Sequence, residues 1–154
     1  MANSDNEFRR RSPVPIEQCG AALATEVISD RWTILIMREA FYGVMRYDDF
    51  REDIGIPRSV LTDRLKRLVD ANMLVRVPYR EGTSRTRYGY ALSETGLSFG
   101  LTLLALMAWG DEHLAENGSA ISILDRSTGK KLKVAIVPDE APEFSMKDIQ
   151  ILPN

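Results

Sequence analysis

A change of hydrophobic period in the middle of the chain constrains the fold more than any other feature of the sequence. In the stretch GIPRSVLTDRLKRLVDANMLV, Leu61, Leu65 and Leu68 stand at positions i, i+4 and i+7, which is the spacing of the buried side of an α-helix. Segments 74–79 (LVRVPY) and 87–92 (RYGYAL) then repeat with a period of two, as strands do. A polar loop containing glycine joins the two segments, so the sequence predicts a β-hairpin directly after this helix.

Further helices are expected before this one. A helical pattern over residues 16–28 carries Cys19 on its apolar side. Asp30 offers an N-cap for the next helix, which runs to Gly43 and is apolar on most sides, so we expect it at the centre of the core. A third, short helix fits residues 46–54.

A long apolar helix is expected after the hairpin, with Ser93 as its N-cap and an end near residue 118. It is more apolar than a surface helix with one buried side needs, which indicates a second partner for it. Its apolar residues are Leu97, Leu101, Leu103, Leu104, Leu106, Met107, Trp109 and Leu114.

The last part of the chain has a different pattern. Segments 119–125 and 131–138 alternate like strands joined by a polar turn, and residues 146–153 are a candidate third strand. The expected organisation is therefore a flexible N-terminal arm (residues 1–15), a main domain (16–118) and a C-terminal β-hairpin extension (119–154).

The distribution of charge is more informative than its total. The net charge of −2 and the isoelectric point near 5.5 do not indicate a polyanionic partner. Residues 55–90, however, carry eight basic and three acidic residues, a net charge of +5, whereas residues 91–154 have a net charge of −4. This asymmetry favours an acidic partner for the basic part. For one basic helix alone, a solvated face is the alternative, and it stays open at this point.

Composition argues against several other classes of protein. One cysteine, Cys19, allows no disulfide within the chain, and no apolar run reaches the ~18 residues that span a bilayer. The N-terminus has no apolar stretch typical of a signal peptide, so we expect a cytoplasmic protein. One Cys and one His (His113, expected at the surface) cannot build a zinc site. No phosphate loop, carboxylate pair or Ser-His-Asp set is recognisable, so neither an enzyme nor a cofactor is expected.

Three helices followed by a two-stranded hairpin is the order of a winged helix-turn-helix, in which one helix enters the DNA major groove. The side of that helix opposite its leucines would contact base edges, and the basic residues beside it would contact phosphates. The hairpin loop would lie along the backbone or in the minor groove. The candidate DNA-binding residues are Arg58, Ser59, Thr62, Asp63, Arg64, Lys66, Arg67, Arg85 and Arg87.

Several short motifs occur in a specific order: Cys19, the pair Arg31-Trp32, Phe50 followed by REDI, then IPRSVLTDRLKRL and YALSETG. Over about residues 16–115, the chain thereby resembles the HxlR-type family of bacterial transcription regulators, a MarR-like group. The resemblance implies a fold that is mainly α with a small β wing, a homodimer paired through the N-terminal helix and the long dimerisation helix, and regulation of a nearby promoter. A two-fold dimer would bind a palindromic or pseudo-palindromic operator in double-stranded DNA.

The sequence departs from the family pattern at two positions. Gly20 follows Cys19 where relatives commonly have proline, and Asp30 replaces a glycine. Some relatives carry a redox- or electrophile-sensing thiol at the position of Cys19. Here the residue lies on an apolar stripe with no basic residue within one turn, so an inert core thiol and a sensor both remain open.

Three further alternatives are left open by the sequence. Trp109, Phe99 and Met107 either pack the core or line a pocket for a small-molecule effector. The basic run at 9–11 either contacts the DNA backbone or keeps the chain soluble. Finally, the basic face could meet an acidic protein surface, which would make the chain a winged-helix protein–protein interaction module without DNA binding.

Overall fold

The winged helix-turn-helix order expected from the sequence is present in the structure. The computed structural model describes residues 14–83, 85–140 and 145–154. It is mainly helical, with two small antiparallel sheets, as expected. In chain order the elements are η1 (Ile16–Gln18), α1 (Gly20–Thr25), α2 (Arg31–Phe41), α3 (Tyr47–Ile54), α4 (Arg58–Asp70), β1 (Leu74–Tyr79), β2 (Arg87–Leu92), α5 (Glu94–Ser98), α6 (Gly100–His113), β3 (Ile121–Asp125), η2 (Met146–Asp148) and β4 (Ile149–Pro153).

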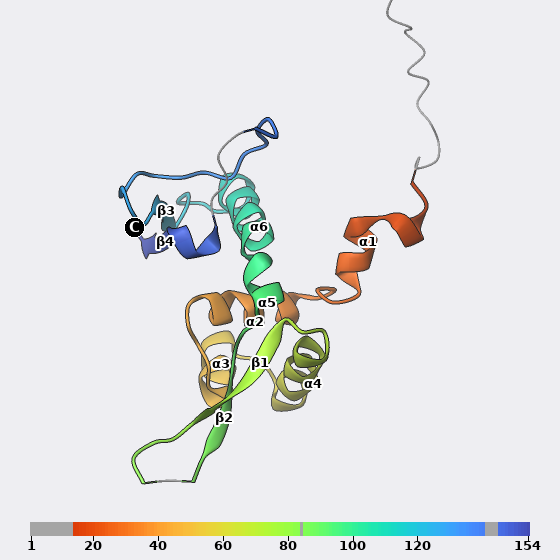
Figure 1. Ribbon diagram of the computed structural model, residues 1–154, viewed down its shortest axis with the longest axis vertical. Helices are drawn as coiled ribbons and strands as arrows, with labels where there is room; N and C mark the ends of the chain where they lie inside the picture. The colour runs from red at the N-terminus through yellow and green to blue at the C-terminus, as the bar shows by residue number, and fades with distance from the viewer. Residues whose placement is uncertain (1–13, 84, 141–144) are drawn as a thin grey trace, which may run out of the picture.

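Helix α2 lies at the centre of the molecule and packs against α3, α4, β2 and α6 (Figure 1). It begins where the sequence predicts, because the carboxylate of Asp30 accepts hydrogen bonds from the backbone N–H groups of Trp32 and Thr33. Its side chains Ile36 and Met37 are fully buried. Trp32 packs only at the edge of this core and is half-buried.

The hairpin β1–β2 forms the wing, with Leu74 paired to Leu92 at its base and Tyr79 paired to Arg87 toward its tip. It lies at the end of the molecule opposite α6 (Figure 1). Its position is set by the loop before α3, because the backbone N–H of Tyr90 donates to the carbonyl of Met45 (2.7 Å). A Cβ on Gly89 would lie 2.7 Å from that carbonyl oxygen, so this approach requires glycine.

Two of the expected helices differ in the structure. The pattern over residues 16–28 becomes the short helices η1 and α1, and Ile16 (68% exposed) and Leu23 (51% exposed) are not packed against the core. The long helix is divided into α5 and α6 at Phe99, whose N–H bonds to the carbonyl of Gly96 in a tight turn. Periodicity predicts an apolar side, but it does not show whether the same chain supplies the surface that covers it.

The strand expected at 131–138 is wrong, and the candidate third strand is the one that forms. Strand β3 pairs with β4, whereas the earlier segment keeps only an isolated bridge between Leu124 and Lys131. After Leu132 the segment leaves the sheet, and Ile136 is fully exposed. Alternation of side chains predicts a pleated surface but does not show which neighbour will pair with it. No described helix is both long and apolar enough to cross a membrane.

Candidate nucleic-acid interface

Helix α4 has one buried side and one exposed side, as its leucine spacing predicts. Leu61, Leu65 and Leu68 are at most 1% exposed and contact the core formed by α2 and α3. The exposed side of the helix carries most of the expected DNA-binding residues, namely Arg58, Ser59, Thr62, Asp63, Lys66 and Arg67. An amphipathic helix therefore presents a polar and charged surface to solvent.

The N-terminal end of α4 has no side-chain cap. Pro57 occupies the cap position and has no group that can accept a hydrogen bond from the first N–H groups, and the first turn holds no acidic residue. The hydroxyl of Tyr47 donates to the carbonyl of Arg58 (2.8 Å) and lies 2.9 Å from Oγ1 of Thr62. The uncapped N–H groups and the helix dipole make this end a suitable place for an anion.

Arg64 differs from the other candidate residues because it is held inside the protein. Its Nε donates to Oδ2 of Asp30 (2.8 Å), and its guanidinium also pairs with Asp63. Burial raises the pKa of Asp30, but hydrogen bonds from Thr33 and from Arg64 outweigh that effect and lower the pKa overall. Asp30 therefore caps α2 and fixes α4 to it at the same time.

The remaining basic residues of α4 divide into paired and unpaired groups. Nζ of Lys66 lies 2.6 Å from Oδ2 of Asp70, and this hydrogen bond raises the pKa of Lys66. Arg58 and Arg67 are exposed and form no ion pair with any described residue. These two guanidinium groups are available to phosphates.

The wing is held to the body by a charged cluster that the sequence did not predict. Arg46, at the N-cap of α3, places a guanidinium nitrogen 2.5 Å from Oε1 of Glu81 and lies over the ring of Tyr79. Glu81 is also 3.9 Å from Arg87. Arg85 is exposed near the tip of the wing, with no ion pair among the described residues. The cluster thus braces the wing where its strands meet the connecting loop, and Arg85 is an exposed cation in that loop.

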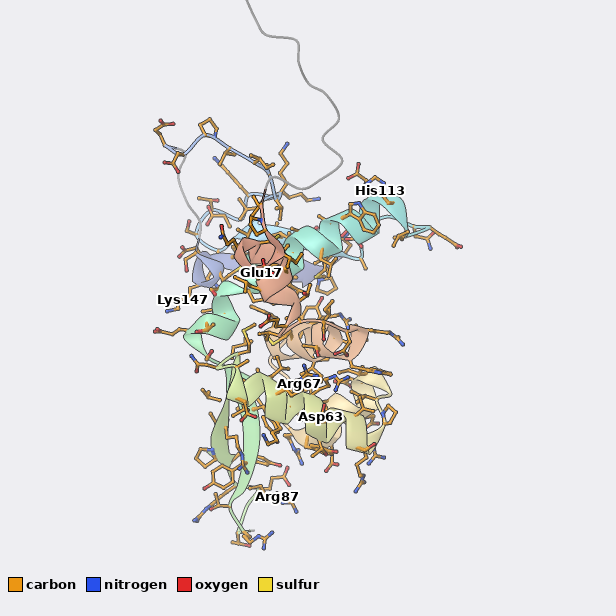
Figure 2. The ribbon with its side chains drawn as sticks, turned by 90° about the vertical axis from the view of Figure 1, so that its right-hand side faces the viewer. Glu17, Asp63, Arg67, Arg87, His113 and Lys147 are labelled. Carbon is orange, nitrogen blue, oxygen red and sulfur yellow. The ribbon has the colours of Figure 1, made fainter. Side chains whose placement is uncertain are left out.

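The structure places the helix and the wing at the same end of the molecule. Figure 2 shows Asp63 and Arg67 along α4 and Arg87 farther down, on the wing. In the opposite direction lies α6, with β3 and β4 beside it (Figure 1). All nine predicted residues therefore lie on α4 or the wing, although four of them already form ion pairs: Asp63, Arg64, Lys66 and Arg87.

Three residues that act on this surface were missed from the sequence. Asp30 was expected only as a cap, and no contact was predicted for Tyr47 or Arg46. Each contacts a residue at least 11 positions away in the chain. The spacing of apolar residues within one helix or strand does not predict contacts between residues far apart in the chain, so the roles of these three residues could not be predicted from it.

Residues considered for other roles lie away from α4. Cys19 is half-buried at the N-cap of α1, a position different from the packed stripe that was expected. The ring of His113 lies 5.3 Å from that of Trp109 on α6. Within the described ranges, no group of three or more His, Cys, Asp or Glu residues is placed to hold a metal ion. The basic run at 9–11 lies outside the described residues.

Comparisons with known proteins agree with this geometry. Residues 27–118 match the model of the HxlR-like helix-turn-helix family. Over 131 residues the chain is 39% identical to Rv3095 of Mycobacterium tuberculosis H37Rv, an uncharacterized HTH-type transcriptional regulator, which covers 84% of this chain and 78% of the relative.

Two solved structures have a similar fold. The crystal structure of PA1607, a candidate transcription factor, has a TM-score of 0.68 and 27% identity, covering 88% of this chain and 95% of that one. The reduced form of the transcriptional regulator YodB from B. subtilis has a TM-score of 0.53 and 26% identity, covering 66% and 98%.

Proposed function

Because the chain belongs to the HxlR-like helix-turn-helix family, we propose that this transcriptional regulator binds a specific operator as a homodimer, with α4 in the major groove and the wing on the backbone or in the minor groove. The observation that carries the proposal is the exposed side of α4. There, Arg58 and Arg67 have no ion pair among the described residues, and the helix begins without a side-chain cap.

The two kinds of contact that operator recognition needs are separate on this surface. Ser59, Thr62 and Asp63 are exposed, and their oxygens are of the kind that contacts base edges. The side chain of Ser59 forms no hydrogen bond with a described residue, whereas Thr62 would exchange its bond to the Arg58 carbonyl, and Asp63 its pair with Arg64, for DNA. Arg58 and Arg67 can contact phosphates on either side of the groove, and the helix N-terminus adds a further site for a phosphate. Lys66 would have to exchange its partner Asp70 for DNA, and Arg64 would act by holding the helix in place.

The wing adds a second point of contact. Arg85 is the better placed of its two candidate residues because Arg87 lies near Glu81. A guanidinium near the wing tip contributes mainly charge, since the minor groove distinguishes bases poorly. We therefore expect the wing to increase the affinity for DNA of any sequence and α4 to provide the sequence specificity.

A homodimer explains the apolar surface that the single chain leaves exposed. On α6, Leu106, Trp109 and Leu114 are 45%, 55% and 72% exposed. On η1 and α1, Ile16 and Leu23 are exposed as well. A two-fold pairing through these elements would bury them and present two copies of α4 to half-sites about 34 Å apart. Cys19, at the start of α1, is then either an inert packed thiol or the residue through which an oxidant or electrophile acts as effector.

Fluorescence anisotropy tests the proposal with labelled DNA from the upstream region of the protein's own gene and with a scrambled duplex. We expect the native sequence to bind at least tenfold more tightly at physiological salt. Arg58→Ala and Thr62→Ala should reduce this ratio, and Arg85→Ala should weaken both complexes equally and reduce the salt slope by about one. Lys131→Ala, an exposed cation in the extension, is the matched control and should change nothing.

The same measurement decides between this function and a protein–protein interaction module. Equal, weak affinity for native and scrambled duplexes would favour an acidic protein partner for the basic surface. A ratio that no substitution on the exposed side of α4 alters would show that α4 does not read the sequence. Sedimentation of wild type and Leu106→Gln tests the homodimer, which the substitution should weaken.

A further inference from the structure

A large cleft separates the main domain from the C-terminal extension. Its volume is about 830 Å³, within the range of small-molecule sites. One wall is formed by α5 and α6, and the other by Ile123 of β3 and by residues from the described segments 132–139 and 145–149 of the extension. A smaller cavity of about 530 Å³ adjoins it, and the two share five lining residues, namely Leu104, Ile123, Leu132, Lys133 and Val134. We call the larger space the extension cleft.

The lining of the extension cleft is mostly apolar. Leu97, Leu101 and Leu104 face it from the helices, and Val134, Val137 and Met146 face it from the extension. Its charged residues are balanced, with Lys133 and Lys147 against Glu94 and Asp139. Figure 2 shows Lys147 near α5 and far from His113, which lies at the other end of α6. Because the charges cancel, the leucine and valine walls determine what can bind, which is a predominantly apolar molecule.

A second copy of the chain is the other occupant to consider, and the geometry of α6 argues against it. Leu106 and Trp109 are exposed but line neither of the two cavities. At 3.6 residues per turn, Leu106 lies about 140° and Trp109 about 80° around the helix from Leu101. These two side chains therefore point to an outer side of α6 that differs from the side that Leu104 turns to the cavities. The outer side is available to a partner subunit, while both walls of the cleft belong to one chain. Dimerisation can therefore leave the cleft free.

The wall formed by α5 is directly connected to the end of α4. The N–H of Ser93 donates to the carbonyl of Met73 (3.1 Å), and the side-chain amide of Asn72 donates to Thr95 (3.2 Å). A Cβ on Gly96 would lie 1.9 Å from the same Met73 carbonyl oxygen, so the two backbones touch. A displacement of α5 must therefore move the turn that follows α4.

We propose that the extension cleft binds a predominantly apolar small molecule, one per chain, and that binding changes the affinity of α4 for DNA. The first part stands on the cleft alone, and the second rests on the function proposed above. Reciprocity requires that DNA alter the affinity for the ligand by the same factor as the ligand alters the affinity for DNA.

The experiment uses the neutral fluorescent probe N-phenyl-1-naphthylamine with the full-length protein. We expect saturable binding with one probe per chain and a blue-shifted emission. Leu101→Gln should weaken binding about fivefold or more, because it replaces apolar wall with a polar group. Leu106→Gln, the same change on the other side of α6, is the matched control and should weaken the dimer but leave probe affinity unchanged. Far-UV circular dichroism and a melting curve establish that both variants fold.

Two results would overturn the site itself. One is wild-type protein that binds no probe up to about 100 μM, far above the range expected for such a pocket. The other is probe affinity that falls in Leu106→Gln but not in Leu101→Gln, or that is lost as the dimer dissociates on dilution, because the site would then lie between subunits.

The regulatory part is tested by repeating the DNA titration with saturating probe. A change in operator affinity of about twofold or more, absent in Leu101→Gln, supports it. An unchanged affinity in a protein that binds both DNA and probe would overturn the coupling. If the unliganded protein does not prefer its own upstream DNA, the proposed function is refuted. Probe binding would then still show whether the cleft is a ligand-binding site.

Discussion

The winged-helix core and the C-terminal extension are built in opposite ways. Every buried residue of the described chain lies between Thr33 and Leu104, and none lies in residues 119–140 or 145–154. The core closes around side chains such as Phe50 and Leu65, which are fully shielded from water. The extension has strands and many hydrogen bonds but encloses no interior, and a two-stranded sheet alone is marginally stable.

This difference indicates where each region obtains its stability. The core needs only its own chain, so its geometry can position α4 and the wing to within the tolerance that operator recognition demands. The extension leaves a cleft beside α6 and a fully exposed Ile136, so buried side chains contribute little to its stability. We therefore expect the part that would read DNA to be rigid and the part that would bind a ligand to be adaptable.

The largest effect is expected in the core. Leu65→Ala removes a fully buried side chain between α4 and α2 and should lower the free energy of unfolding by about 2–5 kcal/mol. Urea denaturation at fixed protein concentration measures the loss, since dimerisation also contributes to apparent stability. Leu65→Met, which nearly conserves volume, should cost less than about 1.5 kcal/mol. If Leu65→Ala lowers the free energy of unfolding only slightly, packing within one chain is not what stabilises the core.

A pair of glycines locates the boundary between the rigid and the adaptable regions. Gly96→Ala forces a Cβ against the Met73 carbonyl and should destabilise the protein by about 1–3 kcal/mol. Gly110→Ala, later in the same part of the chain, has open space around it and should stabilise α6 by about 0.5–1 kcal/mol. Thermal melts compare the two. Equal changes in stability from the two substitutions would show that the backbone is packed no more closely at α5 than at the far end of α6.

Asp30 provides a pH-dependent test of how firmly α4 is held. Its pKa is lowered in the folded protein, so its contribution is present above the pKa of the unfolded chain and is lost as pH falls through the folded value, below about pH 4. Asp30→Ala should cost about 1 kcal/mol at pH 7, through the lost cap and the partly exposed pair with Arg64.

The comparison of Asp30→Ala with wild type over a range of pH separates this role from simple packing. The difference in unfolding free energy should shrink as the medium becomes acidic, because the protonated Asp30 of the wild type no longer pairs with Arg64. Asp30→Asn retains a capping group and should lie between the two proteins at pH 7. A difference that stays constant down to pH 3 would show that the carboxylate charge is not involved.

The same contrast explains what the sequence predicts well. The leucines of α4 and the strands of the wing were predicted because each element packs one side against the same core. Its apolar residues therefore recur at the spacing of a helix or a strand. The break of the helix at Phe99 and the absence of a strand at 131–138 were not predicted. The conformation of these segments depends on contacts with residues distant in the chain, or on the lack of such contacts, and the local sequence does not show either.

Within the candidate site, the exposed side of α4 follows from the positions of its leucines, but the state of each side chain does not. The sequence could not distinguish Arg67, which is free of ion pairs with described residues, from Arg64, which is bound to Asp30 across 34 residues. Both are basic residues beside the same polar surface, and only the fold brings a carboxylate to one of them. Residue type and local period therefore predict the surface, and tertiary contacts decide which residues on it are available.

The smallest effect is expected in the extension, and it tests the comparison most directly. Ile123 lies in β3, opposite Ile151, but its side chain already borders both cavities, so Ile123→Ala creates no new enclosed void. Without a ligand, the loss should be less than about 1 kcal/mol, the transfer free energy of a half-buried side chain without the cavity penalty. In saturating probe the loss should grow, because the ligand completes the wall that Ile123 belongs to. A loss as large as that of Leu65→Ala in the unliganded protein would mean that the extension has a packed interior of its own, and the contrast between the two regions would not hold.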